Sequence, residues 1–415
     1  MQPPVPAPLP RVAAFESMAY GLFLHWGLYS LPERGEWVRH HHKVPTAEYH
    51  QLLDRFTAED WDAPGLVRFA RECGFRYICL GTRHHDGFSL YDTRGLNTYD
   101  APHSAARRDL IAEFAAACHA DGMPMFFYHT TLDWEVASFD QDWDAYQQYL
   151  RDSVEILCRH YGPVAGFWFD GNWARRDRDW QEDRLYSLIR SLQPEAILVN
   201  NSSTGALGKL GHPDLDAITF EQGAPAKLDR AGMARYVAQE MCETVNSHWG
   251  IASRDWSHKS PAQLIHTLAS CRGNGANLLL NVGPLPSGAL PDYETATLRM
   301  IGRWISTCGQ SLYEGRPAEV RCRGTDFVLK AGNEFYYYLH NLPISQNMHL
   351  SGAVRGDGLQ TVEGPLPRIT AVEWVDSGEA LEFNQDAERG FLTFRATPNP
   401  YGSQHVIRVA RLRSA

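Results

Sequence analysis

The sequence predicts an α/β fold: an irregular (β/α)₈ TIM-like barrel over residues 1–317, followed by a small C-terminal β-sandwich domain over residues 318–415. Two observations predict the barrel. Short apolar segments alternate with amphipathic helical segments for about 300 residues, and polar residues recur where the apolar segments end. A change of texture predicts the sandwich, because the segments after Pro317 become short, partly alternating and separated by Gly, Asn, Asp and Pro.

The predicted barrel strands are continuous apolar runs, as expected of parallel strands that are buried on both faces. They cover residues 20–27, 75–87, 123–130, 164–171, 196–201, 217–223 and 275–284. An open, doubly wound sheet would show a similar alternation, but no G-x-G-x-x-G motif follows any of these segments. In a barrel, the polar residues at the strand ends converge on one mouth, where we expect the functional site.

Two of the helical segments between the strands have clear patterns. Residues 143–162 form a predicted helix whose apolar face, at steps of three and four, is made of Tyr146, Leu150, Val154 and Leu157. Residues 104–122 form another, with Leu110, Phe114 and Cys118 at steps of four and Gly122 where a C-cap glycine belongs.

Charge and composition exclude several classes of partner. The 415 residues carry a net charge of −10 and no Lys/Arg-rich run, so neither nucleic acid nor an anionic membrane is an expected partner. No apolar stretch reaches 18 residues, and the Pro-rich N-terminus lacks the regions of a signal peptide, so we expect a cytoplasmic protein. The eight cysteines include no C-x-x-C pair and are predicted to be mostly buried free thiols. Homo-oligomer formation is left open.

Asp170 is the first candidate for chemistry. It ends the segment "VAGFWFDGNW" (164–173), and an Asp-Gly pair is by itself a common turn. Here, however, the preceding strand is fully apolar, and Trp168 and Trp173 flank the carboxylate. Aromatic rings beside a carboxylate at a barrel mouth are typical of sugar sites, so we interpret Asp170 as a nucleophile or base.

Three histidines near strand ends could bind either a metal ion or sugar hydroxyl groups. His84 and His85 are adjacent, so in an extended chain their side chains point different ways, and no H-E-x-x-H motif is present. Neutral imidazoles can reach several hydroxyls of one polyol, which favours the sugar interpretation for His25, His84 and His85. No metal and no cofactor is predicted, and the run 40–42 of three histidines is interpreted as a solvated loop.

A glycosidase needs a second carboxyl group to protonate the leaving oxygen. Glu221 ends the sixth predicted strand, and Glu240 and Glu243 lie in "AQEMCETVNSHWG". Glu36 and Trp37, in "RGEW", belong to the loop after the first strand. Spacing alone does not choose among the glutamates.

Five motifs in order then resemble the α-L-fucosidases of glycoside hydrolase family 29, over about residues 18–316. They are "GLFLHWGLYSLPERGEW", "GFRYICLGTRHHDGFSLY", "FWFDGNW", "EMCETVNSHWG" and "GANLLLNVGP". The family fold, a (β/α)₈-like barrel followed by a β-sandwich, matches the fold predicted from the segments. The resemblance implies an exo-acting, retaining enzyme that removes terminal α-L-fucosyl units from oligosaccharides or glycoconjugates.

By motif, the resemblance implies Asp170 as the nucleophile and Glu240 as the acid/base. It implies a fucose pocket made of His25, Glu36, Trp37, His84, His85, Tyr128, Trp168 and Trp249. Family members place the acid/base on different loops, so Glu221 and Glu243 stay open for that role, and Glu221 is otherwise counted with the pocket.

The sequence departs from the family at two places. The run Asn200–Asn201–Ser202 stands where many members have Asn-Asp-Arg, and Gln239 stands where a Trp precedes the acid/base. These departures concern the side of the pocket that faces the leaving group. Two alternative functions therefore stay open, a non-catalytic fucose-binding barrel and a metal-dependent hydrolase. The departures also leave open transfucosylation and a related sugar such as a galactoside.

Overall fold

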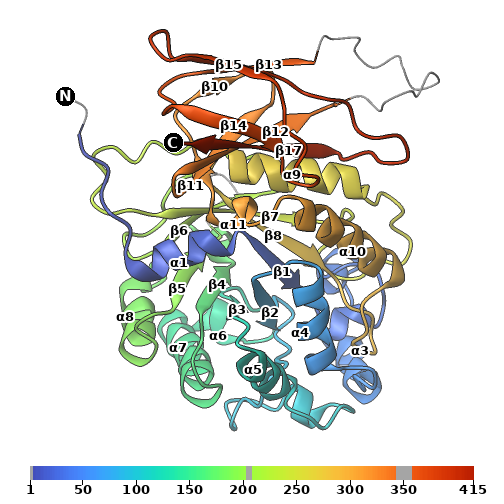
Figure 1. Ribbon diagram of the computed structural model, residues 1–415. Helices are drawn as coiled ribbons and strands as arrows, with labels where there is room; N and C mark the ends of the chain where they lie inside the picture. The colour runs from blue at the N-terminus through green and yellow to red at the C-terminus, as the bar shows by residue number, and fades with distance from the viewer. Residues whose placement is uncertain (1–2, 202–207, 343–357) are drawn as a thin grey trace. The chain divides into compact units, whose positions relative to one another are not determined.

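The computed structural model describes residues 3–201, 208–342 and 358–415 (Figure 1). The chain forms two compact units. The first holds residues 1–259 and 277–297, and the second holds residues 260–276 and 298–415. The domain boundary expected at residues 317 and 318 stays a prediction, because compactness alone does not define an independently folding domain.

The first unit is built on an eight-stranded parallel sheet that curls into a nearly closed barrel, which confirms the predicted fold class. The sheet order is β5-β4-β3-β2-β1-β8-β7-β6. The strands are β1 (Tyr20–Leu24), β2 (Tyr77–Arg83), β3 (Met125–Thr130), β4 (Gly166–Asp170), β5 (Ile197–Asn200), β6 (Ala217–Glu221), β7 (Ala238–Thr244) and β8 (Asn277–Val282). They are almost entirely buried, as the continuous apolar runs predicted.

The two edge strands, β5 and β6, are bridged by Asp216, the residue before β6. Its backbone N–H donates to Leu198 O at 2.8 Å, and its carboxylate accepts from Leu198 N at 3.0 Å. Three guanidinium groups, those of Arg11, Arg190 and Arg235, surround the fully buried carboxylate. A buried carboxylate is stable only when it is paired and hydrogen-bonded, and this one holds the two edge strands together.

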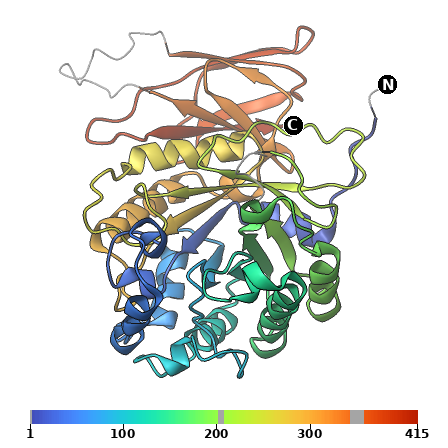
Figure 2. The ribbon, with the colours of Figure 1, turned by 180° about the vertical axis from the view of Figure 1, so that it is seen from behind.

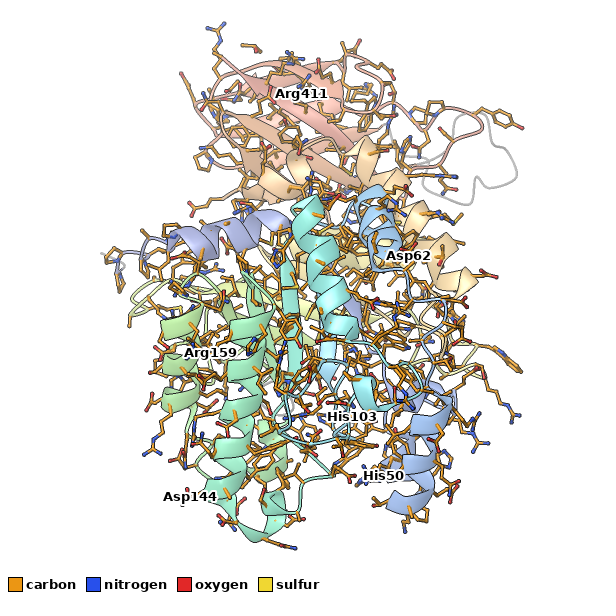
Figure 3. All side chains as sticks on the ribbon, turned by 90° about the horizontal axis from the view of Figure 1, so that it is seen from below. His50, Asp62, His103, Asp144, Arg159 and Arg411 are labelled. Carbon is orange, nitrogen blue, oxygen red and sulfur yellow. The ribbon has the colours of Figure 1, made fainter. Side chains whose placement is uncertain are left out.

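Helices cover the outside of the sheet (Figures 1 and 2). The main ones are α4 (Ala63–Glu72), α5 (Leu110–Asp121), α7 (Trp143–His160) and α8 (Glu182–Leu192); the shorter α2 (Val38–His41), α3 (Thr46–His50) and α6 (Ser138–Gln141) lie in loops. The helix α1 (Pro10–Met18) differs, because its Phe15 packs on Tyr77 and Phe126 among the side chains that face the inside of the barrel. The predicted helix over 143–162 is confirmed as α7, with Tyr146, Leu150, Val154 and Leu157 buried. Asp144 and Arg159 sit in its first and last turns, where they complement the helix dipole (Figure 3).

The other helix prediction is confirmed with a later start. Residues 110–121 form α5, and Gly122 is its left-handed C-cap with φ 67°. Asp109 is the N-cap and accepts from Ala112 N. No helix lies in residues 222–237 between β6 and β7, and none lies in residues 208–216, the described part of the connection that precedes β6.

The second unit contains a β-sandwich, as predicted, together with α9 (Pro261–Gly273) and the short α11 (Ser311–Glu314). The helix α10 (Asp292–Thr307) begins in the first unit and continues in the second. One antiparallel sheet has the order β10-β13-β16-β15 and the other the order β14-β17-β12-β11-β9. Their strands are β9 (Arg316–Pro317), β10 (Arg321–Cys322), β11 (Phe327–Ala331), β12 (Glu334–His340), β13 (Leu359–Glu363), β14 (Ile369–Trp374), β15 (Phe383–Asp386), β16 (Phe391–Arg395) and β17 (Ile407–Ser414).

The core of the sandwich takes side chains from both sheets, among them Tyr337, Trp374 and Phe394. Elsewhere, seven of the eight cysteines are buried and all eight are free, as predicted. None of the helices in the described residues is long and apolar enough to cross a membrane.

Candidate active site

The carboxyl ends of the barrel strands surround a cavity of about 290 Å³. It is lined by Phe23, His25, Trp37, His84, His85, Tyr128, Trp168, Asp170, Trp173, Asn201, Glu221 and Trp249. Most of the residues predicted for the site therefore do meet at one place. Glu36 and Glu240 are the predicted residues that do not line it.

Asp170 is the last residue of β4, and its side chain is 13% exposed. Gly171 follows with φ 122°, and an added Cβ there would lie 2.5 Å from Leu132 N. Only glycine fits this conformation and this close approach. The chain can therefore leave the strand sharply while the carboxylate stays aimed into the cavity.

Four donors fix the two oxygens of Asp170. Tyr128 Oη donates to Oδ2 at 3.1 Å, and His85 Nε2 lies 3.4 Å from the same oxygen. Trp173 Nε1 donates to Oδ1 at 2.9 Å, and Asn201 Nδ2 lies 3.3 Å from it. Burial alone would raise the pKa of Asp170, but the hydrogen bonds from His85, Trp173 and Tyr128 outweigh it and lower the pKa below its usual value. The group is an ionised carboxylate near neutral pH.

Two imidazoles beside the carboxylate are held neutral. Burial lowers the pKa of His25 to about 4, although the hydrogen bond to Asn281 opposes this shift. Burial, with the neighbouring His85 and His25, lowers the pKa of His84 well below its usual value. Asn281 Oδ1 contacts His25 Nδ1 at 2.7 Å, which leaves Nε2 of His25 as an acceptor. Neutral rings of this kind can exchange hydrogen bonds with the hydroxyls of a polyol.

Aromatic rings make the remaining walls. Trp37 and Trp173 stack with ring centroids 5.8 Å apart, and Tyr128 and Trp168 stack at 5.9 Å. Trp249 lies against His25 at 5.2 Å. Flat apolar rings beside polar groups suit a sugar, which presents C–H faces and hydroxyl edges.

Asn201 joins the nucleophile candidate to a second carboxylate. Its Nδ2 lies 3.3 Å from Oδ1 of Asp170 and 2.7 Å from Oε2 of Glu221. Because both oxygens contact one nitrogen, they are at most about 6 Å apart. Glu221 is the last residue of β6 and lines the cavity. Ser202, the other position at which the sequence departs from the family run, lies outside the described residues.

Glu240 lies deeper in the barrel than Glu221. The register pairs Glu221 with Cys242 and Thr219 with Glu240, so Glu240 is two residues, about 6.6 Å, nearer the amino end of the sheet. Its carboxylate accepts hydrogen bonds from Trp168 Nε1 at 2.8 Å and from Tyr77 Oη. Burial raises the pKa of Glu240 to about 7, against the opposing hydrogen bonds from Tyr77 and Trp168. It supports a wall of the cavity from behind.

The two other glutamates are engaged outside the cavity. Oε2 of Glu36 accepts from Trp249 N at 3.0 Å and Gly250 N at 2.9 Å, so Glu36 fixes the loop that carries Trp249. Glu243 lies 3.2 Å from Lys259 Nζ and does not line the cavity.

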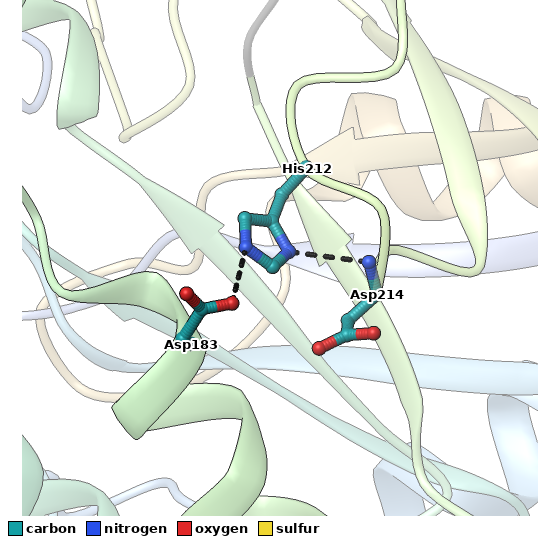
Figure 4. Close-up of side chains that lie close together, drawn as sticks. All are labelled: Asp183, His212 and Asp214. Atoms are coloured by element: carbon teal, nitrogen blue, oxygen red, sulfur yellow. Dashed lines mark hydrogen bonds and ion pairs between the residues drawn. The ribbon is translucent and has the colours of Figure 1, made fainter.

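One group among the described residues has ligand atoms close enough to hold a metal ion: Asp183, His212 and Asp214 (Figure 4). It does not line the cavity. Both ring nitrogens of His212 are already engaged, Nε2 with Asp183 Oδ1 at 3.1 Å and Nδ1 with Asp214 N at 3.1 Å. It is therefore a hydrogen-bonded surface cluster, and His25, His84, His85 and Asp170 form no comparable group.

Sequence reasoning did not assign three residues of the cavity. Phe23 belongs to a segment whose apolar pattern predicts a strand and nothing more. The sequence places Trp173 next to Asp170, but it does not indicate that the indole donates a hydrogen bond to the carboxylate. Asn201 ends the predicted strand 196–201 and belongs to the departure from the family run, but the sequence does not assign it to the pocket. The available signal was position, because all three lie at or near a strand's carboxyl end.

This arrangement of paired carboxylates among imidazoles and indoles at a barrel mouth defines the class of glycoside hydrolases. The chain belongs to the α-L-fucosidase family, whose model matches residues 7–310, and its activity is that of an α-L-fucosidase.

Individual proteins that are similar to this chain are α-L-fucosidases as well. The tissue alpha-L-fucosidases of Bos taurus and Homo sapiens are each 24% identical, over 76% of this chain and 71% of their own. Among solved structures, alpha-L-fucosidase isoenzyme 1 from Paenibacillus thiaminolyticus is similar with a TM-score of 0.82 and 26% identity, covering 97% of this chain and 98% of its own. A Bacteroides thetaiotaomicron GH29 enzyme, trapped as a covalent intermediate with 2-fluoro-fucosyl fluoride, shares the fold with a TM-score of 0.82 and 21% identity over 99% of this chain and 97% of its own.

Proposed function

We propose that this α-L-fucosidase is exo-acting and retaining, and that it removes terminal α-L-fucosyl residues from oligosaccharides or glycoconjugates by double displacement. The observation that carries the proposal is the Asn201 amide shared by Asp170 and Glu221. It limits the separation of their oxygens to about 6 Å, close to the ~5–5.5 Å of retaining enzymes and below the ~6.5–9.5 Å of inverting ones.

The exo mode of action is supported by the size of the cavity. Its volume of about 290 Å³ lies at the lower end of the ~300–1,000 Å³ that small-molecule pockets span. A single terminal sugar fits such a pocket, whereas an internal sugar needs a cleft that is open at two sides.

In the first step, Asp170 attacks the anomeric carbon and the bond to the leaving oxygen breaks. The low pKa of Asp170 and its four donors keep the attacking group ionised and oriented. The acid/base that protonates the leaving oxygen is Glu221 in this proposal, since among Glu221, Glu240 and Glu243 it alone lines the cavity. In the second step, Glu221 as a carboxylate takes a proton from water while the water oxygen attacks the anomeric carbon; the ester bond to Asp170 breaks, Asp170 leaves as a carboxylate, and fucose is released with its configuration retained.

The glutamate assignment replaces the one suggested by the family motif, in which Glu240 is the acid/base. A proton donor must lie within hydrogen-bonding reach of the oxygen that it protonates. Glu240 is separated from the cavity by the Trp168 ring, which it holds. Its raised pKa suits an acid, but its position does not.

Azide rescue with an aryl α-L-fucoside tests both assignments. Asp170→Ala should lose activity, and azide should yield the β-fucosyl azide, because azide then attacks the free substrate directly. Glu221→Ala should slow substrates with poor leaving groups most, and azide should restore turnover as the α-fucosyl azide. Glu240→Ala is the matched control and should show no azide rescue.

Three outcomes would contradict the proposal. If Glu240→Ala rather than Glu221→Ala gives the α-azide, the acid/base is Glu240. If the wild-type protein binds fucose without any turnover, the barrel is a non-catalytic fucose-binding protein. If EDTA abolishes activity, the protein is a metal-dependent hydrolase instead.

A further inference from the structure

A second cavity lies in the barrel unit beside the active site, and the same pair of loops lines both. The loop after β1 and the loop after β7 run antiparallel. Gly35 N donates to Ile251 O at 3.0 Å, and Ser253 N donates to Glu33 O at 3.1 Å. Both loops leave the carboxyl ends of their strands, so they form part of the rim of the barrel mouth.

Neighbouring residues of these loops divide between the two cavities. Trp37 and Trp249 line the active site. Arg34, His248 and Arg254 line the second cavity, a groove of about 560 Å³. The wall between the two is thus one pair of loops at the rim of the barrel mouth, through which the leaving group of a bound fucoside would have to extend.

The loop after β7 is held rigidly. The carboxylate of Asp255 accepts hydrogen bonds from Ser247 N at 2.8 Å and Ser257 N at 2.9 Å, and lies 2.8 Å from His248 Nδ1. Lys259 Nζ donates to Thr244 O at 2.8 Å, which ties the end of the loop back to β7. A surface on such a loop loses little conformational entropy when it binds a ligand.

Trp256 stands on this loop with 85% of its surface exposed, and it is the one exposed tryptophan among residues 3–201, 208–342 and 358–415. Large aromatic side chains are usually buried or placed where a ligand covers them. An indole on a rigid loop at the rim of a sugar pocket offers a flat face to the next sugar ring.

Trp256 adjoins the groove in sequence, next to its lining residue Asp255, and is not itself part of the lining. The groove carries two guanidinium groups, those of Arg34 and Arg254, beside the carboxylates of Glu33 and Asp255, the second of which is held by the hydrogen bonds within its own loop. Neither Arg34 nor Arg254 makes an ion pair within the part of the chain that the structure describes, although the protein's net charge is −10. Guanidinium is the side-chain group best matched to a carboxylate, which it binds with two parallel hydrogen bonds.

We propose that the groove binds the leaving-group part of an acidic fucosylated oligosaccharide. Trp256 stacks on a sugar ring of the leaving group, and Arg34 and Arg254 bind the carboxylate of a further sugar. The inference rests on the proposed function, because it requires that fucose be removed from an oligosaccharide.

Three substrates test this inference: an aryl α-L-fucoside, a neutral fucosylated oligosaccharide, and the same oligosaccharide extended by one carboxylate-bearing sugar. The readout is kcat/KM for each oligosaccharide divided by kcat/KM for the aryl fucoside. Trp256→Ala should lower both ratios about five- to tenfold, as expected for the loss of one aromatic contact. Arg34→Ala combined with Arg254→Ala should lower only the ratio of the acidic substrate, by about tenfold.

Tyr401→Ala is the matched control, since Tyr401 is 77% exposed in the other unit, and it should leave both ratios unchanged. Unchanged ratios in Trp256→Ala, or a wild-type preference for the neutral oligosaccharide that the arginine variants do not alter, would overturn the inference. A wild-type protein without turnover of the aryl fucoside would instead overturn the proposed function.

Discussion

Trp168 and Glu240 are joined by a hydrogen bond of 2.8 Å from the indole Nε1 to the carboxylate Oε1. The indole forms part of the cavity wall, and the carboxylate lies behind it with Tyr77 as its second donor. Tryptophan can only donate through this nitrogen, so Glu240 fixes the rotation of a ring that Phe23 and Tyr128 pack from its sides. With Glu221 proposed as the acid/base, we propose that Glu240 acts as a positioning residue.

Removal of that acceptor should affect substrate binding more than the chemical step. We expect Glu240→Ala to raise KM for an aryl fucoside about tenfold, because the Trp168 wall loses its anchor, and to lower kcat less. Glu240→Gln keeps an oxygen for Trp168 and should restore most of the loss. Steady-state kinetics of the two variants check this. A fall in kcat alone, equal in both variants, would argue against the positioning role.

The pH dependence of stability should also report on Glu240. Its pKa is raised from 4.5 to about 7 in the folded protein, so the native state holds a proton that the unfolded chain has lost. The resulting stability is complete below pH 4.5 and is lost as the pH rises to about 7, a change on the order of 3 kcal/mol. Urea unfolding of wild type and Glu240→Gln at several pH values measures it. The difference between the two curves should change across that window, and parallel curves would contradict the assignment.

The Asn201 amide should matter chiefly for the chemical step. Asn201→Ala leaves Asp170 and Glu221 facing each other without the shared donor, and kcat/KM should fall about 10- to 100-fold, mainly through kcat. Asn201→Asp adds a third negative charge at the same place and should be worse. Asn200→Ala is a useful control, because Asn200 contacts Tyr186 rather than the cavity. Equal effects at positions 200 and 201 would contradict this reasoning.

Protonation of His25 should limit activity in acid. Its pKa is lowered to about 4, so the ring is neutral above that pH and gains a proton as the pH falls through about 4. The cation loses the acceptor at Nε2 that a sugar hydroxyl uses. We expect kcat/KM to fall through about pH 4 in wild type, and we expect this acid limb to move lower in His25→Gln. A pH–rate profile with the same acid limb in both proteins would be the contrary result.

The fold could be predicted from the sequence because a strand that is buried on both faces appears as a continuous apolar run. Runs such as 164–171 and 275–284 are apolar throughout, and they became β4 and β8. β7 was not predicted as a strand, since Gln239, Glu240 and Glu243 interrupt its apolar pattern. These polar side chains are buried with partners, and a partner across the barrel cannot be seen in a linear pattern.

The site could be predicted as a set but not in its internal arrangement. Asp170, His25 and His84 end strands, and a barrel brings strand ends together whatever the loops do. The choice among the glutamates needed the register, which places Glu221 two residues above Glu240. A shift of two residues keeps a side chain on the same face of a strand, so alternation in the sequence carries no information about depth.

The carboxylate of Asp216, with its three arginines, lies at the amino end of β6, far from the mouth, and joins β6 to Leu198 of β5, the two edge strands of the sheet. All three guanidinium groups are partly exposed to solvent. Dissolved ions therefore screen these ion pairs more strongly than they would screen a wholly buried pair. We therefore expect the spacing of β5 and β6 to respond to the ionic strength of the medium at the amino ends of these strands, which is a place that no substrate touches.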